Sequence, residues 1–202
     1  MVAENSFRNL SHSDLQLVML VCEQLHRADP GQSFLRHSRN VMNPVFGHVH
    51  HSHEIYRMNP FALIELENPT VESHMIDVFN RHVTDHPFVP LMLSDKPHHL
   101  ETHQQLPDLA HFKQSDLYNE FYVKVKGQNH LWFAHRAGNK LLSCVCLREN
   151  EFSERELAMA HLIHPHLGTA WKNWKNTRKL KEELGALKQA IFQSKEEEAA
   201  AA

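Results

Sequence analysis

The sequence has few of the features that mark a secreted, membrane-bound or disulfide-stabilised protein. No run of about 18 apolar residues is present, and the first ten residues, MVAENSFRNL, lack the basic and then apolar order of a secretory signal. These absences predict a cytoplasmic protein without a membrane contact. Only three cysteines occur, at positions 22, 144 and 146, and they form neither an even set nor a CxxC pair. No disulfide is therefore predicted.

Signatures of common enzymes are also absent. The chain has no GxSxG, HExxH, P-loop or dinucleotide-binding pattern, which predicts that it is not an enzyme. The formal net charge is −3 with neutral histidines. A chain without a basic excess is not expected to bind nucleic acid or anionic lipid over its whole surface.

The composition is that of one folded domain. The chain has 202 residues, of which 42% are hydrophobic and 22% are charged. These values are ordinary for a globular protein, and the length is sufficient for one sizeable core. One domain with an appendage is therefore expected.

Histidine is the residue in excess, with 19 copies. Four of them fall in the stretch GHVHHSHEIY, residues 47–56, which is predicted to be a strand. Successive side chains of a strand alternate between its faces, so His48 and His50 share one face and His51 and His53 share the other. Two imidazoles on one face could chelate zinc or another divalent transition metal. The alternative is a half-exposed strand that binds no cofactor. Its histidines would then hydrogen-bond to their neighbours or to water.

Hydrophobic spacing and turn residues predict an α+β order of elements with an antiparallel sheet in the middle. Two strands are expected around an Asn59-Pro60 turn, and a later hairpin around a Gly138-Asn139 turn. The second helix is expected to end before Pro44. The predicted segments are, in order, helices from residue 11 and over 33–42, strands over 45–59 and 61–68, a helix within 69–87, long loops over 87–118, hairpin strands over 131–135 and 140–147, and a helix over 153–193.

The last helix carries two apolar stripes. The first stripe comprises Ala160, Ile163, Leu167, Ala170 and Trp174, and the second comprises Leu180, Leu184, Leu187 and Ile191. A stripe on a helix that extends beyond its domain usually packs against a partner helix. This pattern predicts a dimerisation and linker segment over 171–195, in which a homodimer forms through Trp174, Leu180, Leu184, Leu187 and Ile191. Packing against its own domain is the alternative for the first stripe, and residues 196–202 are expected to be a disordered tail.

Several short patterns in the second half of the chain resemble one protein family. They are HPFVPLM at 86–92, FKQSDLYNEFY at 112–122, and LRENEFSERELAMAHLIHPHLGTAWKN at 147–173, with Leu147-Arg148, Phe152-Ser153, Glu154-Arg155-Glu156, Pro165-His166-Leu167, Ala170 and Asn173. Together they resemble the GAF-like sensor domain that precedes the DNA-binding module in LuxR-type bacterial transcription regulators. The resemblance is continuous from about His86 to Asn176.

The resemblance implies a GAF/PAS-like antiparallel sheet flanked by helices, in a sensor domain over residues 1–170 that leads into a long C-terminal helix. It also implies a small-molecule-sensing regulatory function, with an unknown ligand bound beside the sheet under the long connection. Among the residues expected to line this pocket, Tyr118, Tyr122 and Trp132 each combine an apolar body with a polar tip, which can fix the orientation of a ligand. The full set has seven members. They are His50, Tyr56, Leu91, Tyr118, Tyr122, Trp132 and Cys144.

One departure from that family concerns DNA. In LuxR-type regulators a helix-turn-helix domain follows the sensor, whereas only a short charged and alanine-rich segment follows Ile191 here. DNA contact is therefore expected only through a missing helix-turn-helix domain or a partner protein. Two other functions stay open: a metal-binding sensor or storage domain that uses His48 and His50, and a dimerisation module that binds no ligand.

Overall fold

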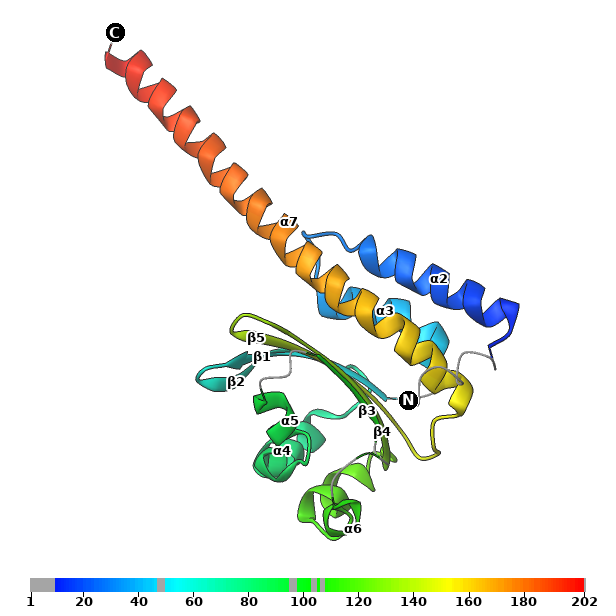
Figure 1. The fold of residues 1–202 in the computed structure, drawn as a ribbon. Coiled ribbons are helices and arrows are strands. Elements are labelled where there is room, and N and C mark those ends of the chain that lie inside the picture. The colour runs from blue at the N-terminus through cyan, green and yellow to red at the C-terminus, as the bar shows by residue number, and fades with distance from the viewer. Residues whose placement is uncertain (1–9, 47–49, 95–97, 103–104, 106–107, 202) are drawn as a thin grey trace.

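The structure of the chain, a computed structural model, describes residues 10–46, 50–94, 98–102, 105 and 108–201 (Figure 1). It has the predicted α+β architecture. The elements are α2 (His12–His26), α3 (Phe34–Phe46), β1 (His50–Met58), β2 (Phe61–Glu67), α4 (Ser73–His82), η2 (Val83–Asp85), α5 (Val89–Leu93), β3 (His98–Thr102), α6 (Leu109–Phe112), η4 (Leu117–Tyr122), β4 (Asn129–Ala137), β5 (Lys140–Arg148) and α7 (Glu154–Ala201). None of the helices within the described ranges is long and apolar enough to cross a membrane.

Three layers make up the molecule, with the sheet in the middle (Figure 1). Helices α2, α3 and the first part of α7 cover one face of the sheet, and we call them the α7 layer. Elements α4, α5 and η4 cover the other face, and we call them the α4 layer. Side chains alternate between the two faces of each strand, so the sheet contributes to two separate apolar cores.

The sheet is antiparallel, with the strand order β2-β1-β5-β4-β3. The two predicted strand pairs are therefore joined through β1 and β5, which are far apart in the sequence. In this register Glu54 lies opposite Ser143, and Trp132 lies opposite Val145. All four side chains point toward the α4 layer, where they line a cavity.

Three segments differ from the sequence prediction. Helix α3 continues through Pro44 because Val45 and Phe46 extend its buried face, and a proline in the last turn removes only one helical hydrogen bond. Strand β3 lies in the segment predicted to be loops; it has five residues without apolar alternation and is held by pairing with β4 at the sheet edge. Helix α7 continues to Ala201, so the predicted disordered tail is helical over 196–201. This segment consists of glutamate and alanine, which both favour a helix.

Charged contacts join the start of α2 to the start of α7. The N–H of Asp14 donates to Ser11 Oγ (3.2 Å) and the N–H of Ser11 donates to Asp14 Oδ2 (2.9 Å), which forms a capping box. Arg155 donates from Nε to Asp14 Oδ1 at 2.9 Å. The hydrogen bond from Arg155, followed by that from Ser11, lowers the pKa of the Asp14 carboxyl. Helix α7 begins with a similar box between Ser153 and Glu156.

The first part of α7 belongs to the core of its own domain. Trp171 is fully buried and Trp174 is 7% exposed. The indole N–H of Trp174 donates to the carbonyl oxygen of Asp29 (3.0 Å), and its ring lies 5.8 Å from that of Phe34. Trp174 therefore packs within its own chain, which corrects its assignment to the dimerisation stripe. The packed part of the chain also extends past residue 170, where the sensor domain was predicted to end.

His51 and His53 from β1 are buried in the α7 layer. Their rings are stacked, with centroids 6.2 Å apart and planes 7° apart. His51 Nε2 lies 3.0 Å from the carbonyl oxygen of Phe46, and His53 Nδ1 lies 2.8 Å from Ser38 Oγ. The two histidines thus share one face of the strand as predicted, but they are core residues, and the half-exposed strand expected from the sequence is wrong at these positions.

Burial of these imidazoles predicts acid sensitivity. Removal from water, the largest cause, lowers the pKa of His51 and lowers that of His53 well below the ordinary value of 6.5. In the unfolded chain both groups bind protons near about pH 6.5, while in the folded chain they stay neutral to lower pH. The free energy of unfolding is therefore expected to fall as the pH drops below about 6.5, by up to about 1.4 kcal/mol for each unit of pKa difference. Urea denaturation at several pH values between about 5 and 8 measures this slope.

The matched variants for this measurement are His53→Gln and His74→Gln. His74 is solvent-exposed in α4, whereas His53 is fully buried. The pH slope of stability should become shallower in His53→Gln and stay the same in His74→Gln, whatever each substitution does to stability at pH 8. A His53→Gln slope equal to that of the wild type would show that the buried imidazole does not cause the acid sensitivity.

Candidate functional site

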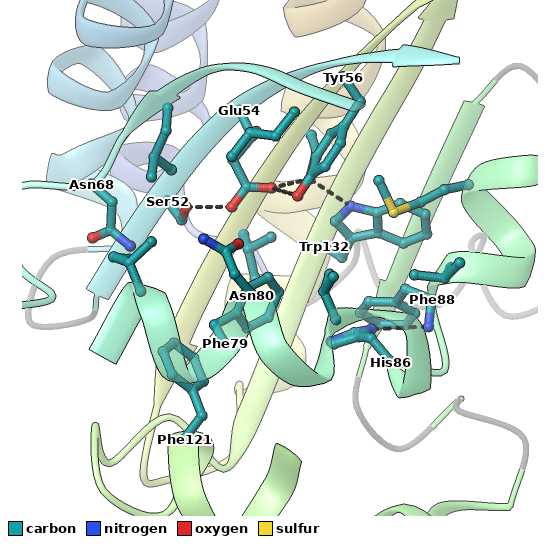
Figure 2. A pocket seen from close by; sticks show the side chains of 18 of the residues that line it. Ser52, Glu54, Tyr56, Asn68, Phe79, Asn80, His86, Phe88, Phe121 and Trp132 are labelled. Carbon is teal, nitrogen blue, oxygen red and sulfur yellow. Dashed lines mark hydrogen bonds between the residues drawn. The ribbon is translucent and has the colours of Figure 1, made fainter. Parts of the chain in front are cut away.

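A cavity lies between the sheet and the α4 layer (Figure 2). Its floor is formed by β1, β4 and β5, and its walls come from β2, α4, α5 and η4. The free volume is about 60 Å³, so a ligand larger than a few atoms must displace some of the side chains around it. Most of the lining is apolar or aromatic. The polar lining side chains other than tyrosines are Ser52, Glu54, Asn68, Asn80, His86 and Ser143.

Strand β1 supplies polar side chains to this cavity. Both faces of the strand are covered by other parts of the protein, one by the α7 layer and one by the cavity and the α4 layer. Ser52, Glu54 and Tyr56 alternate with His51 and His53, so the first three point into the cavity and the histidines point into the α7 layer. A strand buried on both faces has no solvent side on which to place its polar residues. The polar groups must then find partners inside the protein.

Those partners form a network centred on the Glu54 carboxylate (Figure 2). Ser52 Oγ donates to Glu54 Oε1 (2.5 Å), and Tyr56 Oη donates to Oε2 (2.8 Å). Trp132 Nε1 donates to Ser143 Oγ (3.1 Å), and Ser143 Oγ in turn donates to Glu54 Oε2 (3.3 Å). The network thus joins three strands, and its hydrogen bonds all run toward the one carboxylate.

Burial and this network have opposite effects on Glu54. Removal from water, the largest cause, raises the pKa of the Glu54 carboxyl, and the hydrogen bonds from Ser52, Tyr56 and Ser143 lower it in part. Burial also raises the pKa of Tyr56 and Tyr122 well above the ordinary value, and the negative charge of Glu54 raises both further. The tyrosines are therefore neutral hydroxyl groups at any physiological pH.

Aromatic rings form the rest of the cavity. Trp132 is stacked on Phe88, with centroids 4.6 Å apart and planes 18° apart. Tyr56 is stacked on Phe61 at 5.4 Å and 2°, and Phe79 from α4 contacts Phe121 and Tyr122 from η4 at 5.1 and 6.5 Å. Flat apolar walls around a single polar centre suit a ligand with an apolar body and one polar head.

Three of the seven predicted lining residues are brought together in this cavity. Tyr56, Tyr122 and Trp132 come from β1, η4 and β4, and all three line it. Contact between these side chains and a ligand stays a prediction.

The other four predicted lining residues lie elsewhere. His50, at the start of β1, lies beside a surface groove formed with α4 and η4. Leu91 packs within the α4 layer outside the cavity lining. Tyr118 contacts Phe112 edge-on at 5.5 Å. Cys144 points to the opposite face of the sheet, where its Sγ lies 3.3 Å from His53 Nδ1, because it is offset by one position from Ser143 in β5.

Sequence reasoning did not single out Glu54 and Ser143 as lining residues. Glu54 lies in the histidine-rich stretch, where Ser52, Glu54 and Tyr56 alternate with His51 and His53. That alternation is a readable signal of one polar strand face. Ser143 has no such signal, because its role depends on pairing between β1 and β5, and it is 89 positions from Glu54 in the sequence.

The histidine-rich stretch does not bring metal ligands together in the part of the chain that the structure describes. Within those residues no group of three or more His, Cys, Asp or Glu side chains is placed to hold a metal ion. His48 lies outside the described residues, and His50 is separated from His51 and His53 by the strand itself. The pair of His48 and His50 as a chelate stays a prediction.

The fold is similar to that of three solved structures of LuxR-type regulators. The structure of the VqsR LBD domain from Pseudomonas aeruginosa matches with a TM-score of 0.59 and 14% identity, over 82% of this chain and 98% of that one. CepR2 from Burkholderia cenocepacia, an N-acylhomoserine lactone dependent LuxR family transcription factor, matches with a TM-score of 0.55 and 11% identity, over 80% of this chain and 98% of that one. SdiA in complex with octanoyl-rac-glycerol matches with a TM-score of 0.57 and 9% identity, over 82% of this chain and 69% of that one.

These matches define the class of fold: an α+β domain with the architecture of LuxR-type ligand-binding domains. The resemblance inferred from the sequence is confirmed at this level. No protein-family model matches the sequence, and no curated protein matches it. At identities of 9 to 14% the likeness concerns the fold alone.

Proposed function

We propose that this chain is a small-molecule-sensing regulatory domain of a bacterial transcription regulator, and that it signals as a homodimer through α7. The observation that carries the proposal is the aromatic cavity with one polar centre, on a fold shared with regulator domains. CepR2 is described as N-acylhomoserine lactone dependent, and SdiA was solved with octanoyl-rac-glycerol, which supports a ligand with an apolar body. A separate helix-turn-helix domain or partner protein would contact DNA.

Strand β4 offers a physical route from the cavity to α7. Trp132 faces the cavity, and His135, three residues later on the opposite face, packs against α7. The His135 ring lies 4.2 Å from the ring of His164 and directly against the backbone of Gly168. A ligand that shifts Trp132 would therefore favour one placement of β4 against α7 over another, which is a shift in population between two arrangements.

The exposed part of α7 supports dimerisation through the second apolar stripe. Leu180, Leu184, Leu187 and Ile191 are 49 to 64% exposed, and this part of α7 projects away from the three layers (Figure 1). Their 4-3-4 spacing places them on one side of the helix, as at the a and d positions of a coiled coil. A second copy of α7 would remove these four side chains from water.

The charges beside the stripe favour a parallel arrangement of the two helices. With Leu184 and Ile191 at a positions, Glu183 is at g and Lys188 is at the following e position. In a parallel pair these g and e positions face each other across the interface, so Glu183 of each helix meets Lys188 of the other. An antiparallel pair would instead bring Lys181 and Lys188 toward each other.

Native mass spectrometry of the protein purified from bacterial cells tests ligand binding. A mass surplus that is retained in the native protein and lost on denaturation is expected for the wild type. Val145→Phe adds a ring inside the cavity and should abolish the surplus, because Val145 lines the cavity floor. Ile64→Phe makes a comparable change at an exposed position of β2 outside the lining and should keep it. Equal surpluses in both variants would place any bound molecule elsewhere.

A further inference from the structure

The cavity lining that the structure describes contains one acidic side chain and no lysine or arginine. The acidic side chain is that of Glu54. His86 accepts the backbone N–H of Phe88 at Nδ1 (3.0 Å), a bond that the neutral imidazole makes and the protonated form cannot. Within the described part of the chain, the environment of Glu54 is therefore set by burial and by hydroxyl groups.

The hydrogen-bond donors around Glu54 are suited to its ionised form. Ser143 receives the indole N–H of Trp132 and so uses its own hydrogen toward Glu54. Ser52 and Tyr56 also donate. An ionised carboxylate can accept all three of these hydrogen bonds, whereas a protonated carboxyl would have to donate its own hydrogen to one of the hydroxyl oxygens. A buried charge of this kind is costly unless an opposite charge or further donors compensate it.

The walls beside Glu54 are suited to a cation. Trp132 and Tyr56, which flank the carboxylate in the network, present aromatic rings to the same cavity as Phe79 and Phe88 (Figure 2). The faces of aromatic rings attract positive charge, and the attraction is stronger where water is excluded. A carboxylate among aromatic rings combines charge pairing and cation–π contact around one point.

From this geometry we infer that the cavity takes an organic cation, a ligand with a protonated amine on an apolar body, and that the amine pairs with Glu54. This inference rests on the proposed sensing function and names the chemical class of its ligand. The amine supplies the missing charge and N–H donors to the remaining acceptor sites of the carboxylate. An anionic ligand of the same shape would be repelled by Glu54, and a neutral alcohol would leave its charge unpaired.

The test compares three probes that share a six-carbon chain: hexylamine, hexan-1-ol and hexanoate. Calorimetric titration at about pH 7, where an alkylamine is protonated, gives their affinities for the wild type, Glu54→Gln and Glu65→Gln. Glu65 is exposed on β2 and outside the cavity lining, so it controls for loss of one negative charge. The wild type and Glu65→Gln should bind hexylamine about tenfold to hundredfold more tightly than hexan-1-ol, and Glu54→Gln should lose this preference while still binding the alcohol.

The other outcomes overturn the inference. Equal binding of amine and alcohol to the wild type, tighter binding of hexanoate, or an amine preference that survives in Glu54→Gln would each show that Glu54 does not select a cation, and small-molecule sensing would stand. If no probe binds the wild type, the inference fails, and the mass surplus in native spectrometry decides separately whether the cavity holds another ligand. If Glu54→Gln does not fold, the amine-to-alcohol ratio of the wild type decides the question.

Discussion

Replacement of Leu184 and Leu187 together by glutamate is expected to convert the proposed homodimer into a monomer. The two side chains are 51% and 57% exposed in the single chain, and burial of a leucine stabilises an interface by about 1.5–3 kcal/mol. Four leucines are lost across a symmetric pair, so the dissociation constant should rise by at least about 1,000-fold. Sedimentation equilibrium over a range of protein concentrations measures the change.

The matched control is the pair Ala186→Glu and Gln193→Glu. It adds the same charge to the same helix, at exposed positions on the side away from the stripe. This control should remain dimeric. If the Leu184 and Leu187 variant also stays dimeric, the interface lies outside this stripe, and the proposed route of signalling through paired α7 helices is wrong.

Replacement of Gly168 by alanine is expected to lower the free energy of unfolding by about 1–3 kcal/mol, as overpacking of a core does. A Cβ atom at this position would lie 2.7 Å from Cγ and Cε1 of His135, closer than any real contact. His135 is 3% exposed and is held against His164, so its ring cannot move aside freely. Glycine is required here because of a close approach between α7 and β4, and urea denaturation measures the cost.

Gly185 provides the control on the same helix. A Cβ atom there meets nothing within 4 Å, so Gly185→Ala should stabilise the chain by up to about 1 kcal/mol through helix propensity alone. The two identical substitutions should therefore have opposite signs. In a His135→Ala background, Gly168→Ala should cost less than it does in the wild type, because the atoms with which the new methyl group collides are absent. A cost of Gly168→Ala that is the same in both backgrounds would assign that cost to another contact.

These two predictions concern different parts of one helix. Up to Trp174, α7 is a core element whose position is determined by β4 and α3. Beyond that residue its apolar stripe has no partner within the described part of the chain. If the exposed end pairs with a second copy, as we propose, a small displacement at Gly168 would be passed along the helix to the other end. This arrangement agrees with sensing in the cavity on the opposite face of the sheet.

The sequence predicts those residues of the cavity whose positions depend on neighbours close by in the chain. Tyr56 and Trp132 can be identified from the sequence as cavity-lining residues. Tyr56 lies on a strand with clear alternation, and Trp132 lies on a strand that leads into a recognisable hairpin turn. The alternation of residues in β1 predicts that Glu54 shares a face with Tyr56, although the histidines beside it also fit a metal site. Cys144 was assigned to the wrong face, because a strand with both faces buried has no polar side from which its orientation can be inferred.

The sequence by itself determined the local features of this protein: the α+β order, both strand pairs with their turns, the alternation of His51 and His53 with Ser52 and Glu54, and the long final helix. Each of these depends on residues close together in the chain. Only the tertiary structure decided that β1 pairs with β5, that Ser143 and Trp132 therefore reach Glu54, and that Trp174 is a core residue. Those outcomes depend on contacts between segments far apart in the sequence, which no local pattern records.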